Sequence, residues 1–499
     1  MERPGDMSVP PGRLEELEAE GDAPRLGVDE WVASVEGRDE RYSGWTGAIR
    51  REIDRVPRPA FYLAFGVAAG FVPVLTSDAY IVRVGFDTLL YMLLVLGLNI
   101  TVGFAGLLDL GYIAFYGFGA YLFAMLASPK FGIHWNLLAV LPIVIVATAI
   151  LGFLVALPSR RLVGDYLAIV TLFFGQLFVT VFTNGQHISF LGLTRAYDVT
   201  GGPNGIPNVD NFHALGLRIT SVSGYFYAAL VTFMLALTVV YLIEQSRNGR
   251  AWKSLREDAL AAELMGMPVN RLKLVAFTLG AAIAGLAGTL FAALNTAVFA
   301  PDFDVPTLII VYAMLILGGA GSLGGVILGA VVINVSLEVL RTPSHATWIF
   351  YVLILATLIA KLRPWRWFFI VVGGTIGLGF AVHAIATSVW PDQTQGQSQA
   401  GGWLGSALEH WVVELTNPRT VGNIAFIILV FAVLGLTLIH GWVQKIALIP
   451  TLYLAAFVWE NRLSQEPSIT RLILIGVILI VLMNARPQGL LGTARVEIV

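Results

Sequence analysis

Residues 97–111 read GLNITVGFAGLLDLG and place four glycines and one carboxylate inside an otherwise apolar run. The apolar residues around them extend far enough for a helix to cross a hydrocarbon core of about 30 Å. Glycines interrupt helices, and irregular backbone within a membrane is tolerated only where protein or a water-filled cavity satisfies its polar groups. A break of this kind beside Asp109 therefore indicates a translocation pathway.

Two further glycine-rich stretches predict breaks, GFGA at residues 117–120 and GGAGSLGG at residues 318–325. The pattern Gly-x-Ala-Gly-x-Leu occurs at both 103–108 and 318–323, which hints at duplicated halves. The alternative is that these glycines only let helices pack closely. The residues predicted to line the path all lie in or beside a break: Asn99, Gly103, Gly106, Asp109, Gly111, Gly318, Gly321 and Gly324.

The composition is that of a membrane protein. Of 499 residues, 57% are hydrophobic and 13% are charged, a charged fraction about half the usual one, which excludes a soluble multidomain enzyme. The chain has no cysteine, so disulfides and thiolate metal sites are excluded. The net charge of −2 gives no reason to expect a nucleic-acid partner. We therefore expect an all-α polytopic membrane protein embedded in a lipid bilayer.

Apolar runs predict about ten core helices and four inserted ones. They lie near residues 59–76, 81–103, 110–128, 135–157, 164–183, 223–243, 272–297, 306–318, 321–340, 348–362, 367–388, 421–440, 443–459 and 469–485. Residues 1–58, with 14 acidic residues and 9 arginines, predict an acidic cytoplasmic tail. The remaining domains are a core at 59–340, inserted helices with an external loop at 341–468, and a terminal helix with a cytoplasmic tail at 469–499.

Basic loops predict the orientation, because short loops rich in Lys and Arg stay cytoplasmic. Even numbers of predicted helices separate the clusters, so all of them fit on one side of the membrane. The clusters are Arg50 to Arg58, Arg160 and Arg161, Arg247 to Lys273, and Lys361 to Arg366. Both chain ends are then cytoplasmic.

Two segments predict packing surfaces. Ala281, Gly285 and Thr289 follow each other at spacings of four residues and form a surface that another helix can approach closely. In the loop at 244–271, residues 250–268 predict one short amphipathic helix with charges on one side and a Gly and Pro stop. Such a helix suits a groove on a partner protein, since its acidic residues disfavour an anionic lipid surface.

The motifs resemble those of the LivM family, the inner-membrane permeases of the high-affinity branched-chain amino acid importer. They are GLNITVGFAGLLDLGYIAFYGFGAY at 97–121, GDYLAIVTL at 164–172, TGGPNGI at 200–206 and RPQGLLG at 486–492. The resemblance also covers the loop that docks into the ATPase of such importers, through Arg256, Glu257, Ala261, Ala262, Glu263 and Gly266.

The resemblance implies an importer permease bundle with interrupted helices, in a bacterial inner membrane. Its partners are two ATP-binding cassette ATPase subunits, a second permease that forms a heterodimer with it, and a periplasmic substrate-binding protein. The chain contains no Gly-x-x-x-x-Gly-Lys-Ser/Thr sequence, so we expect a transport subunit without an ATPase site. We expect it to bind no cofactor, and ATP to be hydrolysed by the partner subunits.

Two departures and three alternatives remain. Gln176 stands where many relatives carry Glu, and residues 341–468 have no counterpart in the family pattern. A membrane-embedded enzyme is disfavoured because Asp109, Asp165 and Glu338 are scattered. An ion-coupled transporter would not need a docking helix. Urea or short-chain amides stay open as substrates, because permeases for them share these motifs.

Overall fold

The computed structural model describes residues 58–159, 162, 164–186, 198–214, 217–396, 398, 400–439, 441–463, 465, 470, 472–473, 476, 479–480 and 489–491. The chain divides into two compact units, Met1–Ala69 and Gly70–Val499. The predictions for the tail at 1–57, for Arg160 and Arg161, and for most of the terminal helix at 469–485 lie outside the described residues.

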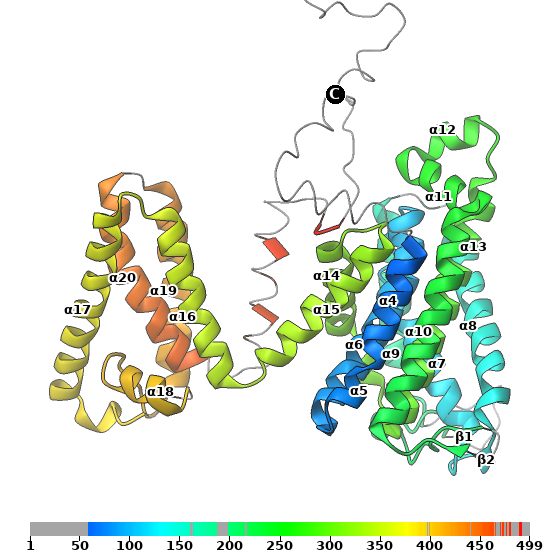
Figure 1. Ribbon diagram of the computed structural model, residues 1–499, viewed down its shortest axis with the longest axis horizontal. Helices are drawn as coiled ribbons and strands as arrows, with labels where there is room; N and C mark the ends of the chain where they lie inside the picture. Colours follow the sequence, from blue (N-terminus) through cyan, green and yellow to red (C-terminus); the bar gives the residue numbers. More distant parts are fainter. Residues whose placement is uncertain are drawn as a thin grey trace, which may run out of the picture. The chain divides into compact units, whose positions relative to one another are not determined.

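The described elements are almost all helical (Figure 1). The α-helices are α4 (Arg58–Gly70), α5 (Val72–Leu75), α6 (Ala79–Leu98), α7 (Tyr112–Leu126), α8 (Leu137–Ser159), α9 (Asp165–Thr183), α10 (Val222–Gln245), α11 (Arg247–Glu257), α12 (Ala259–Leu264), α13 (Val269–Asn295), α14 (Val305–Gly318), α15 (Leu323–Val339), α16 (Pro343–Lys361), α17 (Trp365–Val389), α18 (Gly402–Glu409), α19 (Pro418–Leu438) and α20 (Trp442–Val458).

Short elements connect these helices. Two are π-helical, η2 (Asn99–Phe104) and η6 (Trp459–Leu463), and three are 3-10 turns, η3 (Gly202–Asn204), η4 (Ala300–Phe303) and η5 (Pro391–Gln393). The strands form three antiparallel pairs: β1 (Ala127–Ser128) with β2 (Ile133–His134), β3 (Ile206–Pro207) with β6 (Ala297–Val298), and β4 (His213–Ala214) with β5 (Leu217–Arg218).

Length and composition identify membrane-spanning helices. In the described part of the chain, nine helices are long and apolar enough to span a membrane, and the bent pair α15 and α16 makes up to ten. Two shorter apolar helices lie at Pro59–Leu75 and Tyr112–Leu126. The chain is thus a multi-pass, all-α membrane protein, as the composition predicts.

Two of the three predicted glycine breaks are present. Helix α6 continues into η2, which ends at Phe104, and α7 begins only at Tyr112. The second break separates the end of α14 at Gly318 from the start of α15 at Leu323. The break predicted at residues 117–120 is wrong, because α7 runs through it without interruption.

The glycines of α7 serve close packing instead. A Cβ on Gly119 would lie 2.5 Å from the Cα of Gly285 in α13, so the two backbones touch. On α8, Gly152 has the same role, because a Cβ there would lie 2.5 Å from the Cβ of Ala281. The predicted surface of small residues on α13 is therefore confirmed as an internal packing surface, shared by α7 and α8.

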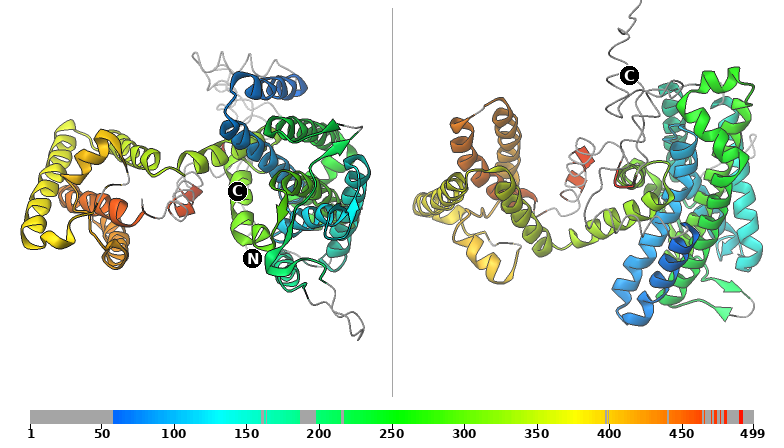
Figure 2. Two further views of the ribbon diagram at one scale, coloured as in Figure 1. Left: turned by 90° about the horizontal axis from the view of Figure 1, so that it is seen from below. Right: turned by 45° about the horizontal axis from the view of Figure 1, so that its top comes forward.

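A separate hydrophobic core holds the C-terminal bundle, which we define as α16 to α20 with η6. Figure 2 shows its helices side by side from two further directions. Trp459 is fully buried, stacks on Phe350 with ring centroids 4.2 Å apart, and donates from Nε1 to Oγ1 of Thr347 at 2.9 Å. A second cluster joins Leu358 and Val371 between α16 and α17.

We expect Gly119→Leu to lower the melting temperature of the detergent-solubilised protein, because the added side chain must push α7 away from α13. Overpacking of this kind costs about 1–3 kcal/mol. The matched control is Gly373→Leu, a helical glycine whose added Cβ meets no atom within 4 Å. Equal melting temperatures for the two variants would contradict the close contact between α7 and α13.

Candidate functional site

The two glycine breaks meet each other inside the core. The fully buried side chain of Asn99 accepts a hydrogen bond through Oδ1 from the backbone N–H of Gly321 at 2.7 Å. A Cβ on Gly103 would lie 2.6 Å from that same nitrogen, and Gly321 has a φ of +90°. Glycine is therefore required at both positions, by close approach at one and by backbone conformation at the other.

One arginine bonds to both breaks. Nη1 of Arg256 donates to the carbonyl oxygen of Gly103 at 2.5 Å and lies 3.4 Å from that of Ala320. A Cβ on Gly106 would lie 2.9 Å from the Arg256 Cγ, so the stem of the side chain fills the space beside the first break. Bonds from a charged donor are roughly twice as strong as those between neutral groups. Arg256 thus ties the loop between α10 and α13 to both interruptions.

Helix α11 holds this arginine in place. Trp252 is fully buried, and its Nε1 donates to the carbonyl of Leu272 in α13 at 2.9 Å. Leu255, next to Arg256 in sequence, is 3% exposed. A bulky anchor one turn before the arginine therefore fixes the direction in which α11 presents it.

The carboxylate at the first break is deeply buried. Asp109 is 1% exposed; its Oδ1 accepts from the N–H of Gly111 at 3.1 Å, while its buried Oδ2 has no hydrogen-bond partner among the residues that the structure describes. The hydroxyl of Tyr312 donates to the Asp109 carbonyl at 2.6 Å, and Oγ1 of Thr171 accepts from the N–H of Leu110 at 2.9 Å. Side chains from two helices, α9 and α14, thus hold this short irregular segment.

The second break receives donors from the end of the chain. The N–H groups of Leu490 and Leu491 bond to the carbonyls of Leu317 at 2.8 Å and Gly318 at 3.0 Å. These carbonyls belong to the last turn of α14, where a helix leaves acceptors unsatisfied. The segment 489–491 therefore completes the break.

The predicted path residues fall into two groups. Asn99, Gly103, Gly106 and Gly321 meet at Arg256, whereas the other four lie around this centre. Among those four, Gly111 packs on Thr171, Gly318 faces Gly325, Gly324 has only a distant side-chain neighbour in Leu491, and Asp109 lies in the first irregular segment.

Sequence reasoning missed Tyr312 and Thr171. Thr171 lies in the GDYLAIVTL motif, which offered a signal, whereas Tyr312 lies in an apolar helix and offered none. The sequence also predicted Arg256 only as part of a surface that docks on a partner. The structure directs its guanidinium into the chain, onto the carbonyl of Gly103.

The predicted single amphipathic helix is two helices. Asp258 ends α11 in an extended conformation and caps α12, because its Oδ1 accepts from the N–H of Leu260 at 2.8 Å and of Ala261 at 2.9 Å. Of the predicted docking residues, Ala262 is buried against its own chain, whereas the others except Arg256 are exposed: Glu257, Ala261, Glu263 and Gly266.

Helix α12 lies beyond the N-terminal start of α13 (Figure 1), and large apolar side chains on it and directly after it are exposed. Leu260, Leu264 and Met265 are 67%, 80% and 81% exposed. No described residues form a group of three or more His, Cys, Asp or Glu that could hold a metal ion. The features that stand out are therefore an internal polar junction and an apolar surface on α12.

Comparison with known proteins places these features in context. A family model described as branched-chain amino acid transport system / permease component matches residues 80–362. The permease protein LivM of the high-affinity branched-chain amino acid transport system from Salmonella typhimurium is 36% identical over 335 residues, covering 62% of this chain and 74% of the relative. LivH from the same organism is 26% identical over 258 residues, covering 49% and 80%.

An archaeal protein is similar as well. The probable branched-chain amino acid transport permease protein LivM from Methanocaldococcus jannaschii is 27% identical over 292 residues, covering 53% of this chain and 80% of the relative. No solved structure matches the chain. The family match includes α16 and ends before α17, so α17 to α20 lie beyond it.

Proposed function

The chain belongs to the family of branched-chain amino acid transport permeases, and on this premise we propose that it is the membrane permease of an ATP-binding cassette importer for leucine, isoleucine and valine. It is a transport subunit with several membrane spans. We place it in a bacterial inner membrane with both termini in the cytoplasm, because the basic loops then lie inside.

The proposed partners follow from what the chain lacks and what it resembles. Its sequence has no phosphate-binding loop for ATP, so two separate ATPase subunits supply the energy. It is similar to both LivM and LivH, two differently named permeases, which supports pairing with a second permease. A periplasmic substrate-binding protein completes the importer, and this chain binds no cofactor.

The observation that carries the mechanism is the bond of Arg256 to both breaks. A displacement of α11 by an ATPase moves the guanidinium, which bonds to the carbonyl of Gly103 and lies beside that of Ala320. Because the breaks also touch through Asn99 and Gly321, they shift as a unit. Nucleotide-driven motion thus reaches the irregular backbone in one step.

Helix α12 is the proposed docking surface. Leu264 at the end of α12 and Met265 directly after it are about four-fifths exposed. Helix α12 lies beyond the N-terminal start of α13 (Figure 1). An apolar helix face of this kind fits a hydrophobic groove on a partner. Since Ala262 is buried against its own chain, it supports α12 and does not contact the ATPase.

The path suits a zwitterion with an apolar side chain. Two buried side-chain atoms near the breaks have no hydrogen-bond partner in the described part of the chain, Oδ2 of Asp109 and Nδ2 of Asn99. The first is an acceptor for the substrate ammonium and the second a donor to the substrate carboxylate. Only transient contacts are needed, because selectivity resides in the binding protein.

The function is tested with the chain in nanodiscs together with its partner permease and ATPases. We expect ATP hydrolysis to rise when leucine-loaded binding protein is added, and radiolabelled leucine to enter proteoliposomes. Urea-loaded binding protein is the control. Stimulation by urea and not by leucine would select the urea or amide alternative, and absence of any ATPase association would remove the importer proposal.

We expect Leu264→Asp to weaken ATPase binding about tenfold or more, since a charge enters an apolar interface at a cost above about 1.4 kcal/mol. Leu264→Met is the matched control and should bind like the wild type. Affinity is measured by interferometry with the immobilised permease complex. Equal binding by both variants would exclude α12 as the docking surface.

We expect Arg256→Gln to keep ATPase binding but to lose at least tenfold of the substrate-stimulated transport rate, because the link to the breaks is cut. The control is Arg250→Gln, since Arg250 is exposed and bonds to the carbonyl of Gln245 on the surface. Wild-type transport by the Arg256 variant would show that coupling runs through another contact.

A further inference from the structure

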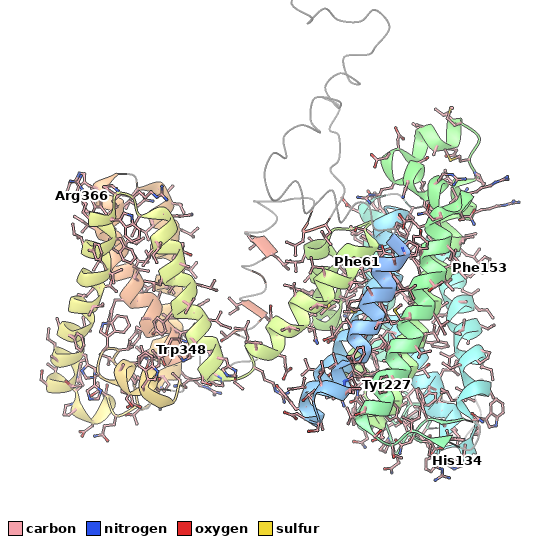
Figure 3. The ribbon with its side chains drawn as sticks, viewed as in Figure 1. Phe61, His134, Phe153, Tyr227, Trp348 and Arg366 are labelled. Atoms are coloured by element: carbon pink, nitrogen blue, oxygen red, sulfur yellow. The ribbon has the colours of Figure 1, made fainter. Side chains whose placement is uncertain are left out.

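Two glutamates meet at one end of the C-terminal bundle. Glu414 precedes α19, and Glu460 lies in η6 directly after α20. The loop between α16 and α17 lies at the other end, where Figure 3 shows Arg366. Trp348 marks the glutamate end on α16, because its ring packs on Trp403 of α18 with centroids 5.3 Å apart.

The amide of Asn461 ties the backbone on both sides of Glu414 to the residue that follows Glu460. Its Nδ2 donates to the carbonyl of Val413 at 2.7 Å, and its Oδ1 accepts from the N–H of Leu415 at 2.8 Å. These bonds grip the residues before and after Glu414 and hold it against the residue next to Glu460. The position of Glu414 is thus held by a buried side-chain amide that bonds to the backbone on both sides of it.

The two carboxylates differ in their partners. Glu460 is 3% exposed and accepts from Oγ of Ser398 at 3.0 Å and from the hydroxyl of Tyr351 at 3.4 Å. Glu414 is 7% exposed, and none of the described residues forms a hydrogen bond with its buried Oε1. An ionised carboxylate in this position loses its hydration and faces a second negative charge, and both effects disfavour the ionised form.

The surroundings do not neutralise Glu414. The titratable groups on the neighbouring elements are His345, Tyr351 and Lys361 of α16, Arg366 and His383 of α17, and Asp392, Glu409, His410, Arg419, Lys445, Tyr453, Glu460 and Arg462. No described Lys or Arg forms an ion pair with Glu414, and Arg462 donates through Nε to Oδ1 of Asn423 at 2.6 Å. Burial first, and then the charges of Glu460 and Glu409, raise the pKa of Glu414 to about 8.

We propose that Glu414 and Glu460 together bind one proton and make the outer end of the C-terminal bundle responsive to pH. A proton is the ligand that fits, because Oε1 of Glu414 is closed to solvent and no described cluster of three metal-ligating side chains lies there. This end of the bundle is the outer one on the proposed function, in which the loop with Arg366 is cytoplasmic.

The direction of the pH effect follows from linkage. The folded chain keeps the proton on Glu414 up to a pH near 8, whereas an unfolded chain releases it near the ordinary carboxyl pKa of about 4.3. The bundle is therefore most stable at the acidic side of this window and loses stability as the pH rises toward 8. Above that pH no further loss is expected from this group.

The test uses the full-length chain in nanodiscs and infrared difference spectroscopy from pH 5 to pH 10. We expect the carbonyl band of a protonated carboxylic acid to disappear in the wild type as the pH passes about 8, and to be missing in Glu414→Gln. Glu409→Gln is the matched control. It removes a more distant negative charge that raises the pKa of Glu414, so it should keep the band, with its loss shifted to a slightly lower pH.

Hydrogen exchange of the peptides around residues 405–417 provides the second measurement. We expect exchange in the wild type to accelerate beyond the intrinsic rate as the pH rises toward 8, with no further excess above that pH, and Glu414→Gln to stay protected. If Glu414→Gln does not fold, Tyr351→Phe replaces it. That variant removes a donor to the Glu460 carboxylate and should shift the loss of the band to a higher pH.

Two outcomes would overturn the proposal. One is that the wild type and Glu414→Gln show the same carboxylic-acid carbonyl bands, which would mean that Glu414 and Glu460 are both ionised in the wild type. The other is protection of the wild type, but not of Glu414→Gln, by sodium or calcium at constant pH, which would mean that an inorganic cation occupies the pair. Neither measurement involves ATPases or substrate, so failure here is distinct from failure of the importer proposal.

Discussion

The bond from Arg256 to the carbonyl of Gly103 is the contact on which the rest of the core depends. Broken helices leave carbonyls and N–H groups without partners, and in a membrane no water replaces them. Here the side chain of Asn99 in the first break accepts a hydrogen bond from the N–H of Gly321 in the second, and the guanidinium of Arg256 donates to a carbonyl in each break. The docking of α11 therefore helps to satisfy the interrupted backbone. A part of the chain that an ATPase can move is in this way also a part that the membrane core requires.

The close approach of the helices has the same origin. Lipid offers no hydrophobic reason for helices to associate, so small residues and backbone contact supply the attraction. Gly119 on Gly285 shows this for α7 and α13, where no side chain separates the backbones. Stiff contact of this kind lets α7 and α13 move together, which is what a force applied at one end of a bundle requires.

Most of the fold was predictable from sequence, because the length and hydropathy of an apolar run identify a membrane-spanning helix. The breaks at 97–111 and 318–325 were predictable too, since glycines there accompany polar residues. The prediction of a break at 117–120 was wrong, because glycines occur in the sequence both where helices pack closely and where they are interrupted. The direction of Arg256 could not be predicted: local periodicity places a residue on a helix face, while only the tertiary fold decides what that face meets.

The two hydrogen bonds from Leu490 and Leu491 to the end of α14 have a consequence for biogenesis. Their acceptors, on Leu317 and Gly318, are synthesised about 170 residues before the donors. During translation the carbonyls of Leu317 and Gly318 therefore lack these two donors while the helices of the C-terminal bundle are inserted. A ribosome that stalls before the final segment leaves a permease whose spans are all in place and whose junction is unfinished, a species for membrane proteases to recognise.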